Sequence, residues 1–250
     1  PGVVGSVDDI QSLIPQLDVH RVVVSLSEAR GKLPMDRLLD LRLRGGVMFD
    51  HLASVYEEYT GKIAVENLRP SWLIFSDGFR KTRALLVVKR ITDLVLAAVG
   101  LVLLLPVMAV VAAVVRLTSP GPAFYHQERV GLNGRTFMVH KFRTMRSDAE
   151  KGTGPVWAQA NDARVTGVGR FLRRTRLDEI PQLWNVLRGD MSFVGPRPER
   201  PKFVDELSAQ IPFYQQRHVV KPGVTGWAQV RYTYGASVED AIEKLQYDLY

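Results

Sequence analysis

The chain has 250 residues, with 33 Lys and Arg against 26 Asp and Glu, for a formal net charge of +7. It contains no cysteine, which excludes a disulfide scaffold and any zinc site built on thiolates. The charge favours anionic partners such as nucleic acid, acidic lipid or phosphorylated substrates, although a solubilising surface has the same composition. No signal peptide is visible at the start. We expect the chain to be a fragment of a longer protein, because it opens with Pro1 and not with Met and stops at Tyr250 inside an amphipathic segment.

The first part of the chain alternates between helical and extended patterns. Its segments predict, in order, a short capped helix over residues 6–14, a buried strand over 19–26, a helix over 33–44 and a strand over 47–49. This order predicts a small parallel sheet flanked by helices. No GxGxxG phosphate loop occurs there, so the sequence does not support a working dinucleotide site.

A long apolar segment follows. Residues 94–115 carry no charge and are nearly all Leu, Val and Ala, which is enough to cross a bilayer as a helix. Pro106 lies in the middle, where it removes a helical hydrogen bond and kinks the axis. Lys and Arg flank both ends of the segment and mark the cytoplasmic side of a membrane. We therefore expect a re-entrant helix hairpin over about residues 91–115; an ordinary spanning helix and a buried core helix are the alternatives.

The rest of the chain is polar and reads as mostly helical with one short β-hairpin. Phe124 and Tyr125 begin a predicted strand, the turn at residues 131–134 follows, and residues 136–142 alternate as the partner strand. The last segment, residues 238–250, has the apolar spacing of a helix.

The densest chemistry lies in residues 172–199. Three arginines there precede two adjacent carboxylates, Asp178 and Glu179. Pro181 is tolerated in the first turn of a helix, so we expect a helix to begin near Asp178 and to end near Gly189. The free N–H groups and the dipole of such a helix start attract an anion.

This combination of residue types suits phosphate chemistry. Arginine matches the geometry of phosphate, a carboxylate can attack phosphorus covalently, and a second carboxylate can hold Mg²⁺ together with substrate phosphates. An isolated Asp-Glu pair is more simply explained by complementation of the helix dipole. The arginines, the turn at residues 195–198 and the upstream apolar segment together favour a functional site.

Six features agree with one family. They are Lys89-Arg90-x-x-Asp93, Pro106, GPAFYHQERVG at 121–131, KFRTM at 141–145, LDEIPQLWNVLRGDMSFVGPRPE at 177–199 and KPGVTGWAQV at 221–230. From about residue 85 to its end the chain resembles the bacterial sugar transferase family, the monotopic polyprenyl-phosphate phosphoglycosyltransferases. Residues 1–80 resemble the regulatory, nucleotide-binding-like N-terminal domain of the long members, in the subgroup associated with exopolysaccharides.

The resemblance implies an activity and roles for particular residues. Such an enzyme moves a sugar phosphate from a UDP-sugar to polyprenol (undecaprenyl) phosphate, which yields polyprenol diphosphate sugar and UMP; this is a sugar-1-phosphate transferase of the EC 2.7.8 type. Asp178 would be the nucleophile that forms a covalent phosphosugar, and Glu179 would bind Mg²⁺. Arg173, Arg197 and Lys141 would bind substrate phosphate.

The resemblance also implies an organisation and a location. Residues 1–80 would form an α/β regulatory-type domain with its connector, and residues 81–250 a membrane-associated catalytic domain with the hairpin bend at Pro106. The active site would lie on the cytoplasmic face of the bacterial inner membrane. UDP-sugar, polyprenol phosphate and membrane lipid are the expected partners, nucleic acid is not, and pairing into a homodimer is left open.

Two other functional classes compete with the transferase. One is a non-catalytic nucleotide-sugar-binding module of a polysaccharide assembly, and the other is a metal-dependent diphosphate hydrolase that uses water in place of a lipid acceptor. His126 and His140 resemble general bases, but a histidine on a strand without a third partner is more often structural. No motif separates glucose, galactose or an amino sugar as the transferred group.

Overall fold

A computed structural model describes most of the chain. The described residues are 2–25, 35–44, 46–65, 82–149, 162–232, 235 and 237–250. The chain divides into two compact units, Pro1–Asn67 and Leu68–Tyr250. The predicted domain boundary between residues 80 and 81 lies outside the described residues.

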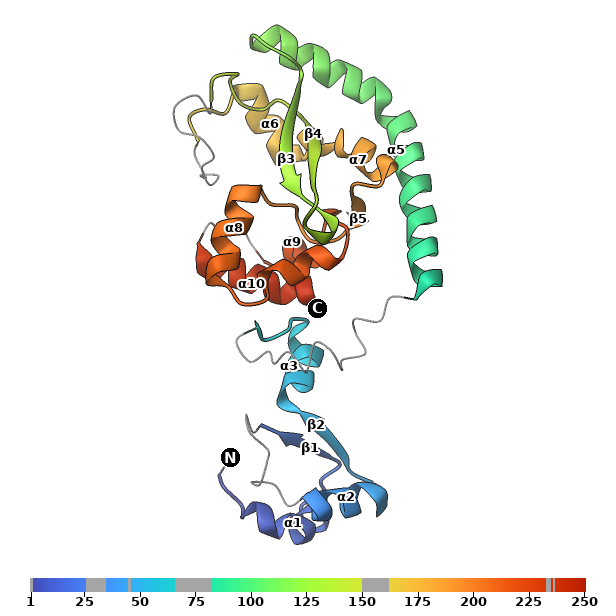
Figure 1. The fold of residues 1–250 in the computed structure, drawn as a ribbon, viewed down its shortest axis with the longest axis vertical. Coiled ribbons are helices and arrows are strands. Elements are labelled where there is room, and N and C mark those ends of the chain that lie inside the picture. The colour runs from blue at the N-terminus through green and yellow to red at the C-terminus, as the bar shows by residue number, and fades with distance from the viewer. Residues whose placement is uncertain are drawn as a thin grey trace. The chain divides into compact units, whose positions relative to one another are not determined.

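The first unit contains helices around a pair of strands (Figure 1). Its elements are a 3₁₀ helix (Val7–Asp9), α1 (Ile10–Gln16), β1 (Arg21–Val24), α2 (Met35–Arg44), β2 (Met48–His51) and α3 (Leu52–Thr60). β1 pairs with β2 in parallel. The predicted order of elements and the parallel pairing are confirmed, while the likeness to a nucleotide-binding fold stays a prediction. The prediction of a buried strand is wrong, because no residue of β1 is fully buried and Val23 is 40% exposed.

Two sets of polar contacts stabilise the first unit: a capping box at its first helical turn and the hydrogen bonds of Arg21. The Ser6 side chain accepts a hydrogen bond from a backbone N–H of the first turn, and Asp9 accepts one from the Ser6 N–H, which together form a capping box. Arg21 on β1 donates to Asp50 on β2 and to Glu58 on α3, at 2.6 Å in each case. One guanidinium thus joins three elements.

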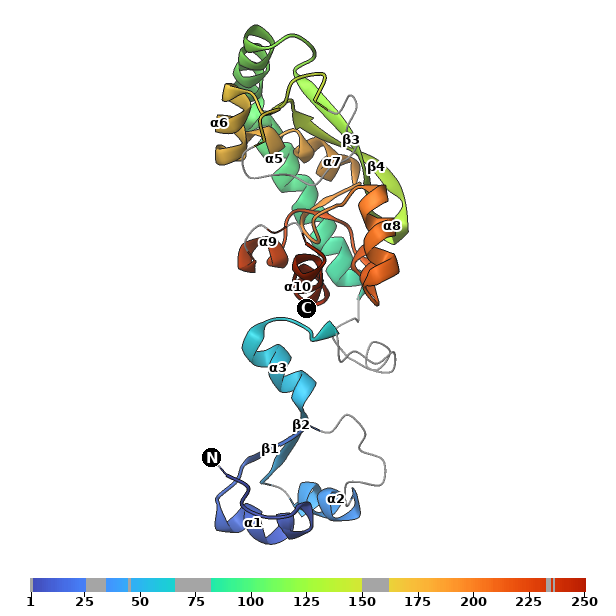
Figure 2. The ribbon, with the colours of Figure 1, turned by 90° about the vertical axis from the view of Figure 1, so that its left-hand side faces the viewer.

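The second unit carries the long apolar helix, a β-hairpin and a set of short helices. Its elements are α5 (Arg83–Thr118), β3 (Phe124–Val130), β4 (Thr136–Phe142), α6 (Gly167–Thr175), α7 (Gln182–Arg188), β5 (Ser192–Val194), α8 (Pro201–Gln210), β6 (Gly223–Thr225), α9 (Trp227–Arg231) and α10 (Val238–Leu249), with 3₁₀ helices at Leu132–Gly134, Leu177–Glu179 and Tyr214–Val219. β3 and β4 form the predicted antiparallel hairpin, and β5 pairs with β6 in parallel. Figures 1 and 2 show α6 and α7 beside α5, with α8, α9 and α10 gathered at the other end of the hairpin.

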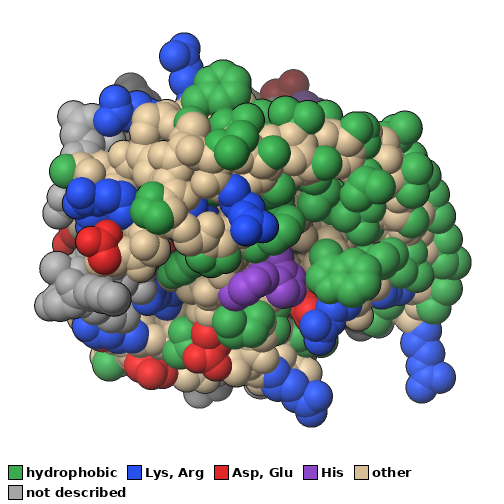
Figure 3. All heavy atoms as spheres, turned by 90° about the horizontal axis from the view of Figure 1, so that it is seen from above, with side chains coloured by type: hydrophobic (Ala, Val, Ile, Leu, Met, Phe, Trp, Pro, Cys, Tyr) green, Lys and Arg blue, Asp and Glu red, His purple; other side chains and the backbone are tan. Residues whose placement is uncertain are grey.

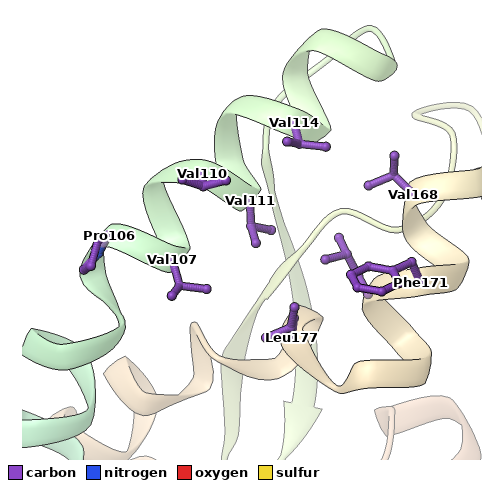
Figure 4. A pocket seen from close by; sticks show the side chains of 9 residues that line it. Pro106, Val107, Val110, Val111, Val114, Val168, Phe171 and Leu177 are labelled. Carbon is purple, nitrogen blue, oxygen red and sulfur yellow. The ribbon is translucent and has the colours of Figure 1, made fainter.

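The apolar segment forms one helix of 36 residues, α5, with Pro106 inside it. The helix changes direction near Pro106 (Figures 1 and 4), as expected where a proline removes a hydrogen bond. By length and composition it is the one helix among the described residues that could cross a membrane. The predicted bend is thus present, but the two halves are continuous, and the re-entrant course through a membrane stays a prediction.

Most of the apolar surface of α5 is not covered by protein. Only 11% of its most apolar 18-residue stretch is buried, and Val102 and Leu103 are 73% and 68% exposed. Figure 3 shows hydrophobic side chains gathered along the side of this unit where α5 lies. The interpretation as an ordinary buried core helix is therefore wrong, since a core helix is covered all round.

Arg90 fixes the first half of α5 to the short helix α7. Its guanidinium donates to the backbone carbonyls of Val186 and Leu187, at 2.7 and 2.8 Å. These carbonyls belong to the last turn of α7, where a helix leaves carbonyls without N–H partners four residues ahead; the Val186 carbonyl also accepts a hydrogen bond from the Gly189 N–H at 3.1 Å. A positive charge is also favourable at a helix C-terminus because of the helix dipole.

Asp93, one turn further along α5, holds the strand β5. Its Oδ1 accepts hydrogen bonds from the Ser192 hydroxyl and from the Phe193 N–H, both at 3.1 Å, and only 5% of the residue is exposed. Lys89 donates to the same hydroxyl at 2.5 Å and to the Val194 carbonyl at 3.2 Å. The Lys-Arg-x-x-Asp pattern is therefore an attachment between the apolar helix and the polar body.

A second attachment lies at the other end of α5. The guanidinium of Arg143, which follows β4, donates to the carbonyls of Ser119 and Pro120 at 2.8 and 2.5 Å, and to the Ser119 hydroxyl at 2.9 Å. Arg143 is only 6% exposed. Both ends of α5 are consequently attached to the same body.

Two apolar clusters, one on either side of Pro106, pack α5 against β4. One cluster joins Ala97 of α5 to Val139 of β4, and another joins Val111 of α5 to Phe142 of β4. Because the residues at each site are almost fully buried, each half of the helix gains apolar burial against the same strand.

We predict that Asp93→Leu destabilises the protein in detergent by roughly 2–4 kcal/mol, because it leaves two buried donors without an acceptor. Asp93→Asn, which keeps an oxygen at the same place, should lose less. Thr92→Val is the matched control, since the exposed Thr92 hydroxyl only donates back to the Val88 carbonyl of its own helix. Denaturation midpoints measure the effect, and equal losses for Thr92→Val and Asp93→Leu would contradict it.

Candidate functional site

The two carboxylates lie in a short 3₁₀ helix between α6 and α7. Arg176 ends α6 in the left-handed conformation, with φ of 61°, and turns the chain into Leu177–Glu179. Such a conformation costs a non-glycine residue about 1 kcal/mol or more. This turn buries the two acids in a 3₁₀ helix that packs against β4.

The prediction that one helix begins near Asp178 is wrong. The α-helix begins only at Gln182. Pro181 has no N–H to donate to the carbonyl of Leu177, which disfavours an α-helical turn at the acids. The Ile180 N–H bonds to Leu177 with 3₁₀ spacing instead. The carboxylates therefore do not cap α7, and dipole complementation does not explain them.

Asp178 is buried, with 7% of the residue exposed. Among the described residues, none hydrogen-bonds its Oδ1. Burial raises the pKa of Asp178, and the charge of Glu179 raises it further, while Lys141 and Arg173 act in the opposite direction. A buried carboxylate oxygen without a partner is costly to maintain, and such groups cluster at functional sites.

Glu179 has the opposite surroundings. Its Oε1 accepts hydrogen bonds from Lys141 Nζ at 2.9 Å and from Arg197 at 2.8 Å, and Arg176 lies 3.8 Å away. Burial acts to raise the pKa of Glu179, but the charges and hydrogen bonds of Arg197 and Lys141 outweigh it and lower the pKa to about 2. Glu179 is thus a fixed anion that gathers cations.

Lys141 reaches the site from β4. Burial and the charge of Arg197 together lower the pKa of Lys141 to about 8, although Glu179 offsets part of their effect. The ammonium group is therefore held among like charges, and an added anion would relieve it.

Two further side chains, Gln229 and Arg217, hold Arg197. Its guanidinium donates to Gln229 of α9 at 3.1 Å, and its carbonyl accepts from Arg217 at 3.1 Å. Arg217 is buried and paired with Asp248 of α10 at 2.6 Å. Sequence reasoning missed Gln229 and Arg217; Gln229 lies in the matched stretch at 221–230, which was the available signal.

The turn that carries Arg197 depends on close backbone packing. A side chain at Gly195 would meet the Lys221 carbonyl at 2.3 Å, and one at Gly223 would meet the Gly195 nitrogen at 2.2 Å. Only glycine allows β5 and β6 to approach in this way. The two matched stretches at 177–199 and 221–230 therefore meet here.

Arg173 lies beside the carboxylates on α6. Its Nε donates to the Thr144 hydroxyl at 2.9 Å, and its charge acts to lower the pKa of Asp178. The structure thus brings together five predicted site residues, namely Asp178, Glu179, Lys141, Arg173 and Arg197. The sixth, Pro106, lies away from them on α5.

His126 and His140 face each other across the β-hairpin. Their Nδ1 atoms are 2.7 Å apart, and they occupy opposite positions of β3 and β4. Burial lowers the pKa of His140, and His126 lowers it further. The pair is a cross-strand contact, and sequence reasoning missed it because it treated each histidine alone.

The carboxylates suit only one kind of metal site. The described part of the chain contains no cluster of three or more His, Asp and Glu that could hold a metal by itself. Mg²⁺ needs only one or two carboxylates when substrate phosphates and water complete its shell. The adjacent Asp178 and Glu179, with an unpartnered oxygen on Asp178, fit that limited requirement.

Comparison with known proteins identifies a family and close relatives. The family described as "Bacterial sugar transferase" matches residues 84–250. A relative from Aeromonas hydrophila, named "UDP-N-acetylgalactosamine-undecaprenyl-phosphate N-acetylgalactosaminephosphotransferase", is 40% identical over 200 residues, which cover 80% of this chain and 46% of the relative.

A second relative covers nearly the whole chain. It comes from Xanthomonas campestris pv. campestris, is named "UDP-glucose:undecaprenyl-phosphate glucose-1-phosphate transferase", and is 39% identical over 248 residues, which are 98% of this chain and 46% of the relative. A protein of the same name from Escherichia coli (strain K12) is 46% identical over 158 residues, which are 63% of this chain and 33% of that protein. This chain spans about half the length, or less, of these three relatives.

We predict that Glu179→Gln destabilises the protein at neutral pH by about 2–3 kcal/mol, because it leaves two partly buried cations without their anion. Since the pKa of Glu179 falls to about 2 on folding, its stabilisation is present above its ordinary pKa of 4.5 and is lost as the pH falls toward 2. The variant should therefore lose stability less steeply over that range.

The matched control is Asp148→Asn, which removes an exposed ion pair with Arg146 at 3.9 Å and should change little. Denaturation midpoints of the three proteins across this pH range test the prediction. Parallel pH profiles for Glu179→Gln and the wild type would contradict it.

Proposed function

We propose that this chain, which belongs to the bacterial sugar transferase family, transfers a sugar phosphate from a UDP-sugar to polyprenol phosphate. The observation that carries the proposal is the contrast between two neighbouring acids: Asp178 Oδ1 is buried without a partner, whereas Glu179 is held by two cations. The relatives' names support the substrate classes. Because those names differ in the sugar, the sugar is not assigned.

In the proposed first step, Asp178 attacks the phosphorus that carries the sugar. A bond forms between its carboxylate oxygen and phosphorus, the bond from that phosphorus to the bridging oxygen breaks, and UMP leaves with the electron pair. In the second step, a phosphate oxygen of polyprenol phosphate attacks the same phosphorus, which releases Asp178 and forms polyprenol diphosphate sugar. The unpartnered Oδ1 supports Asp178 in this role, since no hydrogen bond withdraws its lone pairs.

The cations around Glu179 would bind the diphosphate. Phosphoryl transfer depends on positioning and on neutralisation of charge at the phosphate oxygens. Arginine can grip phosphate with two donors, so Arg173 and Arg197 suit this role, and Lys141 adds a point charge. Glu179 holds Lys141 and Arg197 in place until the substrate arrives.

We also propose that Mg²⁺ binds at Glu179, with substrate phosphates and water as its other ligands. When bound, the ion would neutralise charge on the phosphates. Lys141, Arg197 and Arg176 surround this one carboxylate, so substrate phosphate would give the cations a second anion and leave Glu179 available to hold the ion.

The attachment of α5 supports a re-entrant course in the membrane. Arg90, near its start, and Ser119, at its end, are both bound to the same polar body, which must stay in water. A straight crossing would place those two ends on opposite sides of the bilayer. With basic residues before and after the apolar run, we propose that both ends face the cytoplasm at the bacterial inner membrane.

The proposal extends to the first unit by resemblance alone. We take it as a regulatory domain through which two chains pair in a polysaccharide assembly.

The alternative activities are less well supported. A pure binding module has no need of an unpartnered buried carboxylate, and a hydrolase has no need of a membrane-embedded helix beside its site.

We predict that Asp178→Asn lowers UMP release from a UDP-sugar, in the presence of Mg²⁺ and polyprenol phosphate, by at least about a thousandfold, because the nucleophile is lost. Intact-protein mass spectrometry of the wild type with UDP-sugar and Mg²⁺, but without lipid, should show a phosphosugar adduct that Asp178→Asn lacks. Asp205→Asn, on the exposed side of α8, is the control. UMP release at the full rate without lipid would support the hydrolase instead.

The re-entrant course predicts that cysteines introduced as Leu85→Cys and Thr118→Cys both react with a membrane-impermeant thiol reagent from the cytoplasmic side. The chain has no cysteine of its own, so the background is clean, and both positions are exposed. Leu103→Cys, inside the apolar run, should react only after detergent is added. Labelling of positions 85 and 118 from opposite sides would contradict the proposal.

A further inference from the structure

An open groove of about 470 Å³ lies between the second half of α5 and α6 (Figure 4). Every residue that lines it is apolar, including Pro106, Val107 and Val111 of α5 and Val168 and Phe171 of α6. Its volume is within the range of small-molecule sites. A ligand for this groove must therefore be a hydrocarbon over the whole length that it buries.

Two residues that line the groove are chain neighbours of candidate-site residues. Leu177, which lines it, directly precedes Asp178, and Leu172, which also lines it, directly precedes Arg173. A molecule whose hydrocarbon part fills the groove would thus place the adjoining atoms beside a proposed nucleophile and a proposed phosphate-binding arginine.

The helix α6 has the pattern expected where the open side of the groove faces an apolar medium. Val168, Phe171 and Leu172 lie at helical spacing on one side, while its arginines lie on the others. Phe171 is 60% exposed, although it lines the groove. A helix with exposed apolar and arginine-rich sides is typical of the boundary between lipid and water.

We infer that this groove binds the first isoprene units of the polyprenol phosphate acceptor, next to its phosphate. The inference rests on the proposed function and adds a seat for the acceptor. In a prenyl phosphate the hydrocarbon begins directly after the phosphate oxygen, which suits a lining that turns apolar one residue from Asp178. A phospholipid has glycerol and ester groups at that place, and these would be buried without polar partners.

The test compares acceptors of different length. Wild-type protein in detergent is assayed with dimethylallyl phosphate, which has one isoprene unit, and with farnesyl phosphate, which fills more of the groove. Val107→Trp blocks the groove and should lower the ratio of kcat/KM for farnesyl over dimethylallyl phosphate by about tenfold or more, as expected for the loss of at least two buried methylene groups.

Val102→Trp is the matched control, because Val102 lies on the same helix, is 73% exposed and does not line the groove. It should leave the ratio unchanged. An unchanged ratio in Val107→Trp, with a wild type that turns over, would overturn the groove assignment. Failure of the wild type to release UMP with any acceptor would instead overturn the proposed function.

Photocrosslinking in wild-type protein keeps the groove testable if the Trp variant does not fold. Farnesyl phosphate with a diazirine on its chain should label peptides that contain Val107 or Val168, and undecaprenyl phosphate should compete with it. Stronger labelling of the same peptides by a photoactivatable phosphatidylcholine, without competition by undecaprenyl phosphate, would assign the groove to bilayer lipid and overturn the inference.

Discussion

The hydrogen bonds of Arg90 and Asp93 join an apolar helix to a charged body, and the placement of the site depends on them. Arg90 binds the end of α7, and Asp93 binds the start of β5. The Asp178–Glu179 turn immediately precedes α7, and Arg197 follows β5. The same contacts that attach the helix therefore also fix both sides of the carboxylate pair relative to α5.

The site buries charged side chains, which is unfavourable unless they are paired, and it pairs its two acids to different extents. Glu179 satisfies Lys141 and Arg197 together, and the buried pair of Arg217 and Asp248 supports Arg197 from behind. The charges of its neighbours act on the pKa of Asp178, but no described residue donates a hydrogen bond to its Oδ1. Two chemically similar acids thus differ in pKa direction because of their partners alone, which is the arrangement that separates a nucleophile from an organising anion.

The sequence predicted features that arise from local pattern. The uncharged run, the β-hairpin and the helix at the end of the chain follow from periodicity, and the site residues followed from their resemblance to a family. The local pattern around Asp178 and Pro181 was misread, because one missing N–H moved the helix start beyond the acids. The partners of Gln229, Arg143 and the two paired histidines were missed, although Gln229 and Arg143 lie in matched stretches, because each acquires its role from a residue distant in the chain.

Pro106 has a further consequence for the bilayer itself. From Arg90 to Pro106 the helix rises about 24 Å (16 residues at 1.5 Å each), whereas one leaflet contributes about 15 Å of hydrocarbon. In the proposed re-entrant arrangement, the first half of α5 must tilt strongly, or the lipids around it must deform. Hydrophobic mismatch would then couple bilayer thickness to the height of the carboxylates above the membrane, so that lipid composition would act on this protein mechanically.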